Sequence, residues 1–235
     1  LLRVYWNGGG IWNRGRAELA KYLGQEPTEM QYQVWNWYHF CWLSGDNICE
    51  QHVHNIDIGN WLMGDQHPVE ANGMGGCTLR YIGENKGTGQ IFDHHFVEFT
   101  YKDGTKMFSQ CRHMPNTWGP VEEHIHGTKG ESGAATGGGP RLESGNPYVQ
   151  EHIELIKAMR NGSKFNEGHY GADSSFTAVL GRMATYSGQV VKWDEAVAKG
   201  PDEAPDLLSW NDKPPVVKGE DGNYPIAVPG VYKAY

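Results

Sequence analysis

The chain has 235 residues, and 28 acidic against 20 basic side chains give it a formal net charge of −8. This length suffices for one large domain or two small ones, with a hydrophobic core that needs no disulfide or metal. The acidic balance argues against nucleic acid as a partner, because a phosphate backbone requires a basic face. No apolar stretch is long enough to predict a membrane span. The 32 glycines, without a G-X-Y period, indicate a globular domain rich in loops.

The sequence begins at Leu1 and shows no charged segment followed by an apolar one. We therefore expect no targeting segment and expect the chain to be part of a longer product, which leaves its localisation open. The four cysteines, Cys41, Cys49, Cys77 and Cys111, form no C-x-x-C pair and match no zinc-ribbon spacing. A chain of this length has no need of disulfides, so we expect free thiols.

The first elements predicted are a strand, an aromatic-rich segment and a helix. Residues 1–6 have the composition of a strand, and they lead into a glycine-rich loop at 7–16. Residues 28–43 hold six aromatic side chains without a clear helical or strand period. A polar turn then starts a helix from about residue 48 to residue 63, which Gly64 ends.

A β-hairpin is the clearest signal in the middle of the chain. Residues 68–82 have the composition of strand and turn, and residues 91–101 alternate in polarity as a strand does. The Asp-Gly pair at 103–104 predicts a tight turn into a return strand at 106–112. Residues 131–145 are rich in small and polar side chains and predict an exposed loop.

Two helices and a tail are predicted for the last part of the chain. Asn146 as cap and Pro147 at the first helical position begin a helix that Gly162 ends. An apolar stripe predicts a second helix that starts near Asp173 or Ser174. We therefore expect an α+β fold with an open, mostly antiparallel sheet and helices packed on one face. Residues 1–199 would form this domain, and residues 200–235, irregular and rich in proline, its extended wrapping tail.

The densest polar cluster lies on the helix predicted at 48–63. At 100° per residue, Glu50, His54, Asp57 and Trp61 share one narrow stripe, whereas His52 points nearly opposite to Glu50. An imidazole flanked by carboxylates is the usual arrangement for general acid–base catalysis. The alternative interpretation is a solvated helix face stabilised by pairs four residues apart.

A metal site competes with this interpretation. The chain holds three closely spaced histidine pairs: His52/His54, His94/His95 and His124/His126. On a helix, His52 and His54 would point about 200° apart and would not share an ion. On a strand, His124 and His126 would share one side, close to Glu122. We assign no metal ligands, and the metal-dependent alternative stays open.

The glycines do not form a nucleotide-binding motif. Neither G-x-G-x-x-G nor G-x-x-x-x-G-K-[ST] occurs, so we expect turns and close backbone approaches instead. Tryptophan rings can stack on sugar faces, and arginine or histidine can bind hydroxyl groups or anions. The candidate substrate-binding residues are Trp12, Arg14, Trp37, His52, Trp61, Arg112 and His113.

Residues 45–64 resemble the central helix of the Gfo/Idh/MocA oxidoreductases. The family motif is a glycine-rich turn followed by an acidic residue, a His four residues later, an Asp three residues after the His, and then Trp-Leu-x-Gly. This chain has the matching residues at these positions: Glu50, His54, Asp57 and Trp61. The family usually has Asp where this chain has Glu50. The hairpin at 96–109, the turn at 126–130 and the helix pair after Asn146 also resemble the family. The stretch at 166–173, together with the proline-rich tail, is similar to the bacterial-type C-terminal domain common in planctomycete members.

The resemblance implies a fold and a function. In this family an N-terminal Rossmann domain binds NAD(P), and an α/β substrate and oligomerisation domain with an open sheet follows it. This chain resembles only the second part. The resemblance implies NAD or NADP bound by a domain absent from this chain, which alone would be inactive. It further implies a sugar, cyclitol or keto-sugar substrate, and a homo-oligomer formed through the open sheet face.

By the same resemblance, His54 is the acid/base beside the hydride-transfer site, and Glu50 or Asp57 orients it. Two alternatives remain. One is a metal-dependent glycoside hydrolase, lyase or epimerase that uses the His/Glu cluster. The other is a non-catalytic domain that serves assembly.

Overall fold

The computed structural model describes residues 1–81, 86–132, 143–203, 205–206 and 209–235. The strands are β1 (Leu2–Gly8), β2 (Glu70–Gly76), β3 (His94–Thr100), β4 (Lys106–His113), β5 (Val121–Gly127), β6 (Gly130–Ser132) and β7 (Val191–Lys192). The helices are α1 (Arg16–Leu23), α2 (Glu29–Trp35), η1 (Trp37–His39, a 3₁₀ helix), α3 (Cys41–Ser44), α4 (Asn47–Glu50), α5 (Val53–Leu62), α6 (Pro147–Asn161), α7 (Gly168–Ser187) and α8 (Trp193–Lys199).

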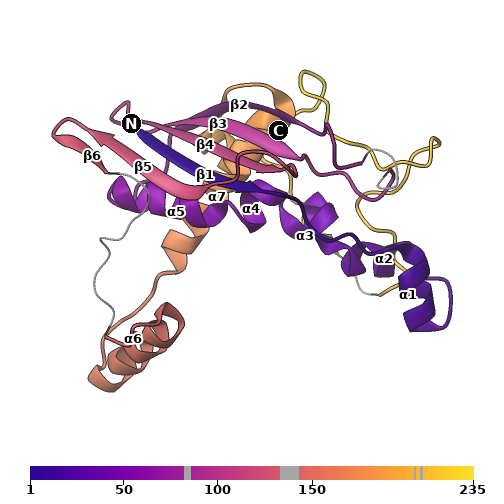
Figure 1. Cartoon of the computed structure of the whole chain (residues 1–235), viewed down its shortest axis with the longest axis horizontal. Helices are drawn as coiled ribbons and strands as arrows, with labels where there is room; N and C mark the ends of the chain where they lie inside the picture. The colour runs from indigo at the N-terminus through magenta and orange to yellow at the C-terminus, as the bar shows by residue number, and fades with distance from the viewer. Residues whose placement is uncertain (82–85, 133–142, 204, 207–208) are drawn as a thin grey trace.

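The strands form one open sheet in the order β6-β5-β1-β4-β3-β2-β7 (Figure 1). Only the β1–β4 pairing is parallel, and the other pairings among the described strands are antiparallel. The predicted hairpin is β3 and β4, which pair in register from His94–Arg112 to Thr100–Lys106. The turn between them has φ +84° at Gly104, a conformation that glycine adopts without strain. The α+β prediction with a mostly antiparallel sheet is confirmed.

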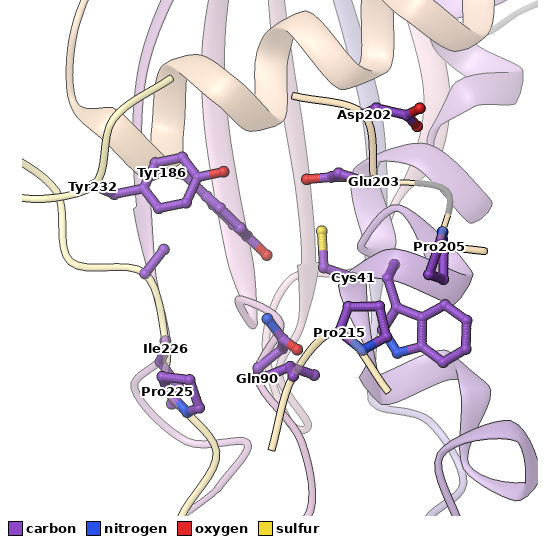
Figure 2. Close-up of a pocket in the computed structure, with 13 residues that line it drawn as sticks. Cys41, Gln90, Tyr186, Asp202, Glu203, Pro205, Pro215, Pro225, Ile226 and Tyr232 are labelled. Atoms are coloured by element: carbon purple, nitrogen blue, oxygen red, sulfur yellow. The ribbon is translucent and has the colours of Figure 1, made fainter. Parts of the chain in front are cut away.

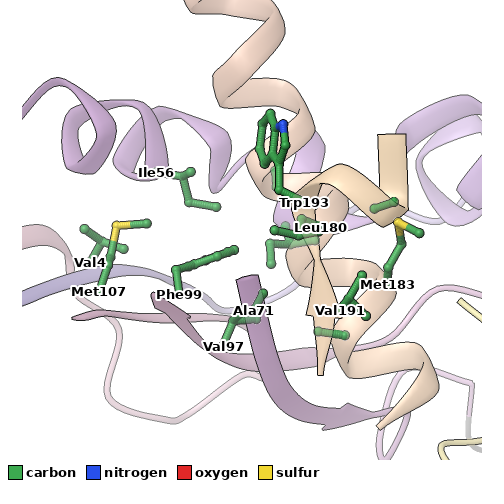
Figure 3. Packing of buried hydrophobic residues seen from close by; sticks show 14 of the residues in the cluster. Val4, Ile56, Ala71, Val97, Phe99, Met107, Leu180, Met183, Val191 and Trp193 are labelled. Atoms are coloured by element: carbon green, nitrogen blue, oxygen red, sulfur yellow. The ribbon is translucent and has the colours of Figure 1, made fainter. Parts of the chain in front are cut away.

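One face of the sheet carries the hydrophobic core. Side chains alternate along the strands, so that Val4, Val97, Phe99 and Met107 point to the same side (Figure 3). They pack against α4, α5 and α7, which bring Ile48, Ile56, Leu180 and Met183 to the cluster. The helices on this face therefore hold fixed positions relative to the strands.

The other face of the sheet is not covered by α4, α5 or α7. It carries Arg3 from β1, Met74 from β2, Phe96 from β3 and Phe108 from β4. Met74 is 71% exposed, and the rings of Phe96 and Phe108 lie 6.0 Å apart, both half-buried. The helices pack on one face, as the sequence predicts.

The prediction of one continuous helix at 48–63 is wrong in one respect: the structure has two helices, α4 and α5, which are separated at Gln51 and His52. The amide of His52 donates to Asn47 O, five residues earlier, so the helical turn is wider here than in a regular α-helix. The break turns His52 into the core, where its ring shares a 2.8 Å hydrogen bond with Ser109 Oγ. A tertiary contact therefore overrides the helical period.

The two later helices follow the sequence signals closely. Asn146 Oδ1 accepts a 2.9 Å hydrogen bond from the amide of Tyr148, and Gly162 ends α6 with φ +65°. The helix predicted from Asp173 starts earlier, at Gly168. In Figure 1, α6 stands away from the sheet, and none of its side chains is buried.

The segment after α8 has neither helix nor strand in its described residues. Specific contacts hold it to the rest of the chain: Val216 O accepts from Gln33 Nε2 at 2.8 Å, and the amide of Gly230 donates to Ser187 O at 2.8 Å. Most of the predicted loop at 131–145 and the end of the stretch at 68–82 lie outside the described residues. In the part of the chain that the structure describes, no helix has the length and apolarity needed to cross a bilayer. All four cysteines are free thiols.

Candidate functional site

Buried polar side chains fix α5 against the sheet. His52 bonds to Ser109 on β4, and Asn55 Nδ2 donates to Glu123 on β5. Near the other end of the helix, Tyr101 Oη donates to Asn60 Oδ1 at 2.8 Å. Asn55, Ile56, Gly59 and Asn60 form the inner face, so the opposite side of α5 is left to solvent.

That outer side forms one wall of a cleft between α5 and the first half of α7. The cleft has a volume of about 550 Å³ and contains three of the predicted residues, His54, Asp57 and Trp61. The facing wall includes Tyr170 and Ser174 from α7. The Ser174 hydroxyl donates a 2.6 Å hydrogen bond to Asp57 Oδ1, which fixes that carboxylate at the cleft wall. The cleft is therefore lined by an imidazole, the carboxylates of Asp57, Asp65 and Glu167, hydroxyls and aromatic rings.

His54 is exposed at this cleft, and its ring lies 5.8 Å from the ring of Trp6 on β1. Neither Glu50 nor Asp57 forms a hydrogen bond or ion pair with it. The imidazole is therefore open to a ligand on its outer side. The orientation of His54 by a carboxylate stays a prediction.

Glu50 lies at the end of α4, outside the cleft lining. Burial raises the pKa of its carboxyl to about 8, and a 2.8 Å hydrogen bond from Gln51 offsets only part of the shift. Its Oε1 is buried without a hydrogen-bond partner. A carboxyl with this pKa exchanges its proton near neutral pH, as a general acid or base requires.

Arg80 is a residue that the sequence did not single out. It is buried in the loop after β2, and its Nη2 donates to His113 Nδ1 at the end of β4. Its Nε and Nη1 have no hydrogen-bond partner. The positive charge of Arg80 lowers the pKa of Glu50 and so offsets part of the rise that burial causes. No spacing signal in the sequence joins Arg80 to His113, and only the fold brings them together.

The predicted His52 and His113 are buried away from solvent. Burial lowers the pKa of His52 to about 3, and burial together with the charge of Arg80 lowers the pKa of His113 to about 3. Both rings are therefore neutral in the folded protein, and His52 acts structurally by holding α5 to β4.

The remaining predicted residues form separate groups. The Arg14 guanidinium lies 4.3 Å from the ring centroid of Trp12 and 4.9 Å from that of Trp35. Trp12 and Trp37 meet edge to face at 6.0 Å. Arg112 donates from Nη2 to the carbonyl of Trp118. None of these side chains lines the cleft at His54.

The histidine pairs do not assemble a metal site. His124 bonds to Glu122 at 3.0 Å, and His126 bonds to Glu131 at 3.1 Å. Across the described ranges, no group of three or more His, Cys, Asp or Glu side chains is placed to hold one ion. No observation therefore favours the metal-dependent alternative.

Comparisons with known proteins rest on structure. No family profile matches the chain, and no curated protein matches it. Solved structures do match. One is GenD2 from gentamicin A biosynthesis in complex with NAD, which has TM-score 0.56 and 13% sequence identity to this chain. The match covers 82% of this chain and 54% of that chain.

Two further matches are inositol dehydrogenases. The scyllo-inositol dehydrogenase from Lactobacillus casei with bound NAD(H) and scyllo-inositol has TM-score 0.51 and 16% identity, and the match covers 81% of this chain and 55% of that chain. The myo-inositol dehydrogenase from Corynebacterium glutamicum ATCC 13032 has TM-score 0.51 and 13% identity, with the same coverage of 81% and 55%.

These matches define the class of fold. The chain has the fold of one part of the Gfo/Idh/MocA-type dehydrogenases, and the resemblance predicted from the sequence is confirmed at this level. The chain spans little more than half the length of the structures that it matches.

Proposed function

We propose that this chain is the substrate-binding half of an NAD(P)-dependent oxidoreductase that acts on a sugar, a cyclitol or a keto derivative of either. The observation that carries the proposal is the cleft of about 550 Å³ with His54, Asp57 and Trp61 in a dehydrogenase-type fold. Ring polyols present hydroxyls at the edge and C–H groups on the faces. Asp57 and Ser174 would bind hydroxyls, and the ring of Trp61, 61% exposed, would pack on a C–H face.

The glycine-rich segment after β1 does not fit a dinucleotide. The glycines after β1 lead into a loop rather than a helix, since α1 begins only at Arg16, and a dinucleotide loop needs a helix N-terminus directly after the turn. We propose that a separate domain holds NAD or NADP, which exchanges a hydride with the substrate carbon.

In this proposal His54 handles the proton. Oxidation of an alcohol releases a hydride from carbon and a proton from oxygen, and the exposed imidazole would take up the hydroxyl proton. In the reverse direction it would return that proton to the carbonyl oxygen. Glu50 lies outside the cleft lining and forms no hydrogen bond with His54, so the proposal assigns the proton transfer to His54.

The test is His54→Ala in the complete protein with its dinucleotide domain. Loss of a general acid–base should lower kcat by about 10²–10⁴-fold, while the Kd for NAD or NADP stays unchanged. His152→Ala is the matched control, because His152 is an exposed histidine on α6 and does not line the cleft. Unchanged kcat in His54→Ala would refute the role of His54. No turnover of any polyol by the complete protein with either nucleotide would refute the proposed activity.

We further propose a homo-oligomer formed through the open sheet face. Exposed Met74 and the half-buried pair Phe96 and Phe108 support this, because exposed apolar side chains on a broad face favour association. Met74→Glu should dissociate the oligomer, as measured by light scattering, and a monomeric wild-type protein would contradict the proposal.

A further inference from the structure

A second cavity lies between the folded body and the C-terminal segment, far from His54. Its volume is about 460 Å³, within the range typical of small-molecule sites. It shares no lining residue with the cleft at His54. Tyr186 lines this cavity and Ser174 lines the cleft, and 12 residues of α7 place the two about 18 Å apart along the helix.

The walls of the cavity are held together by specific contacts. The buried side chain of Gln33 accepts from Trp42 Nε1 at 2.7 Å and donates to Val216 O at 2.8 Å, so one amide joins a lining residue of the body to one of the C-terminal segment. Tyr224 packs edge to face on Phe40 at 4.9 Å, directly beside the lining residue Pro225. The cavity is therefore a formed feature of the folded chain.

Most of the lining consists of rings and aliphatic groups. Trp42 is among the lining residues. The rings of Tyr232, Pro205, Pro215 and Pro225 also line the cavity (Figure 2). Such walls favour an occupant with an apolar ring, because flat apolar surfaces pack with large contact area.

The polar groups of the cavity define the rest of the occupant. Gln90 Oε1 is buried without a hydrogen-bond partner, and Figure 2 shows the Gln90 amide directed into the cavity, toward Cys41. A buried acceptor without a partner is rare and costly, so a donor on the ligand would satisfy it once the Gln90 side chain rotates and turns Oε1 toward the cavity.

The cavity is lined by the carboxylates of Asp202 and Glu203 and by the Cys41 thiol, and it offers no uncompensated charge from Glu203 or Cys41. The carboxylate of Glu203 is paired with Arg182 at 2.7 Å. Burial raises the pKa of the Cys41 thiol to about 12, so the thiol is neutral at physiological pH. A charged ligand would lose its hydration without gaining a free counter-charge from these groups.

We propose that this cavity binds a neutral small molecule with an apolar ring and one hydroxyl or N–H donor, the chemistry of a phenol or an indole, with Gln90 as the acceptor of its hydrogen bond. The site is separate from the proposed oxidoreductase site and does not depend on it.

The test uses three matched probes, p-cresol, toluene and p-toluate, titrated into the 235-residue chain and followed by backbone amide shifts. We expect p-cresol to shift the amides of Gln90, Ile226 and Ala227 saturably at millimolar concentration. Toluene should bind about fivefold more weakly, because it lacks one neutral hydrogen bond, and p-toluate should not bind. His54→Ala should leave p-cresol binding unchanged.

Two variants locate the binding. Gln90→Leu should remove the advantage of p-cresol over toluene, and Ala227→Phe should abolish binding of both by filling the cavity. The proposal is overturned if p-cresol shifts no amide at the cavity at about 10 mM, or if toluene equals p-cresol in the wild-type chain. It is also overturned if Gln90→Leu retains the full preference for p-cresol.

Discussion

Gly181 lies where α7 packs against the sheet, and its replacement by alanine tests the packing that builds the cleft. A Cβ at this position would lie 2.8 Å from Phe99 Cζ, 3.0 Å from Ile48 Cδ1 and 3.3 Å from Val97 Cγ2. Carbon atoms in contact prefer about 3.5–4.0 Å. Phe99, Ile48 and Val97 are fully buried and have little room to move.

Overpacking of this kind costs about 1–3 kcal/mol, and the better helix propensity of alanine returns up to about 1 kcal/mol. We therefore expect Gly181→Ala to reduce the free energy of unfolding by roughly 0–2 kcal/mol, or to lower Tm by up to about 8 °C for a chain of this size. Urea denaturation followed by circular dichroism measures the change. Gly171→Ala is the matched control on the same helix, because a Cβ there meets nothing within 4 Å, and it should gain up to about 1 kcal/mol. A gain in stability for Gly181→Ala equal to that of the control would refute the packing of α7 on Phe99.

Three further predictions concern titration and capping. Burial lowers the pKa of His52 from 6.5 in the unfolded chain to about 3 in the folded protein. The free energy of unfolding therefore decreases as pH falls from 6.5 toward 3, because the unfolded chain takes up the proton first. His52→Gln should make this decrease shallower. Burial raises the pKa of Glu50 from 4.5 in the unfolded chain to about 8 in the folded protein. The free energy of unfolding therefore decreases as pH rises from 4.5 toward 8, because the unfolded chain loses the proton first. Glu50→Gln should remove this decrease. Denaturation series at stepped pH measure both, and slopes that match the wild type would contradict the burial of these side chains. Asn146→Ala should cost α6 about 1 kcal/mol and speed amide exchange there, while exchange in α7 stays unchanged.

Elements whose signals are local in the sequence have the predicted boundaries. Asn146, Pro147 and Gly162 bound α6 through capping contacts within a few residues, and the Asp-Gly turn at 103–104 defines the hairpin of β3 and β4. The clustering of His54, Asp57 and Trp61 at one cleft follows from helical spacing, since all three stand on α5.

The remaining features depend on contacts between distant residues. His52 breaks the helix because it reaches Ser109, which is 57 residues away. Arg80 meets His113 across 33 residues, and Ser174 meets Asp57 across 117. These contacts cannot be predicted from the periodicity of the sequence, because they depend on how the sheet brings α5, α7 and the loop after β2 together.

The most direct test of the central claim is a crystal structure of the complete protein soaked with myo-inositol. The account predicts a ring in the cleft between α5 and α7, with a hydroxyl within hydrogen-bond distance of His54 and another at Asp57. Inositol bound elsewhere on the protein, with His54 and Asp57 in contact only with water, would contradict it.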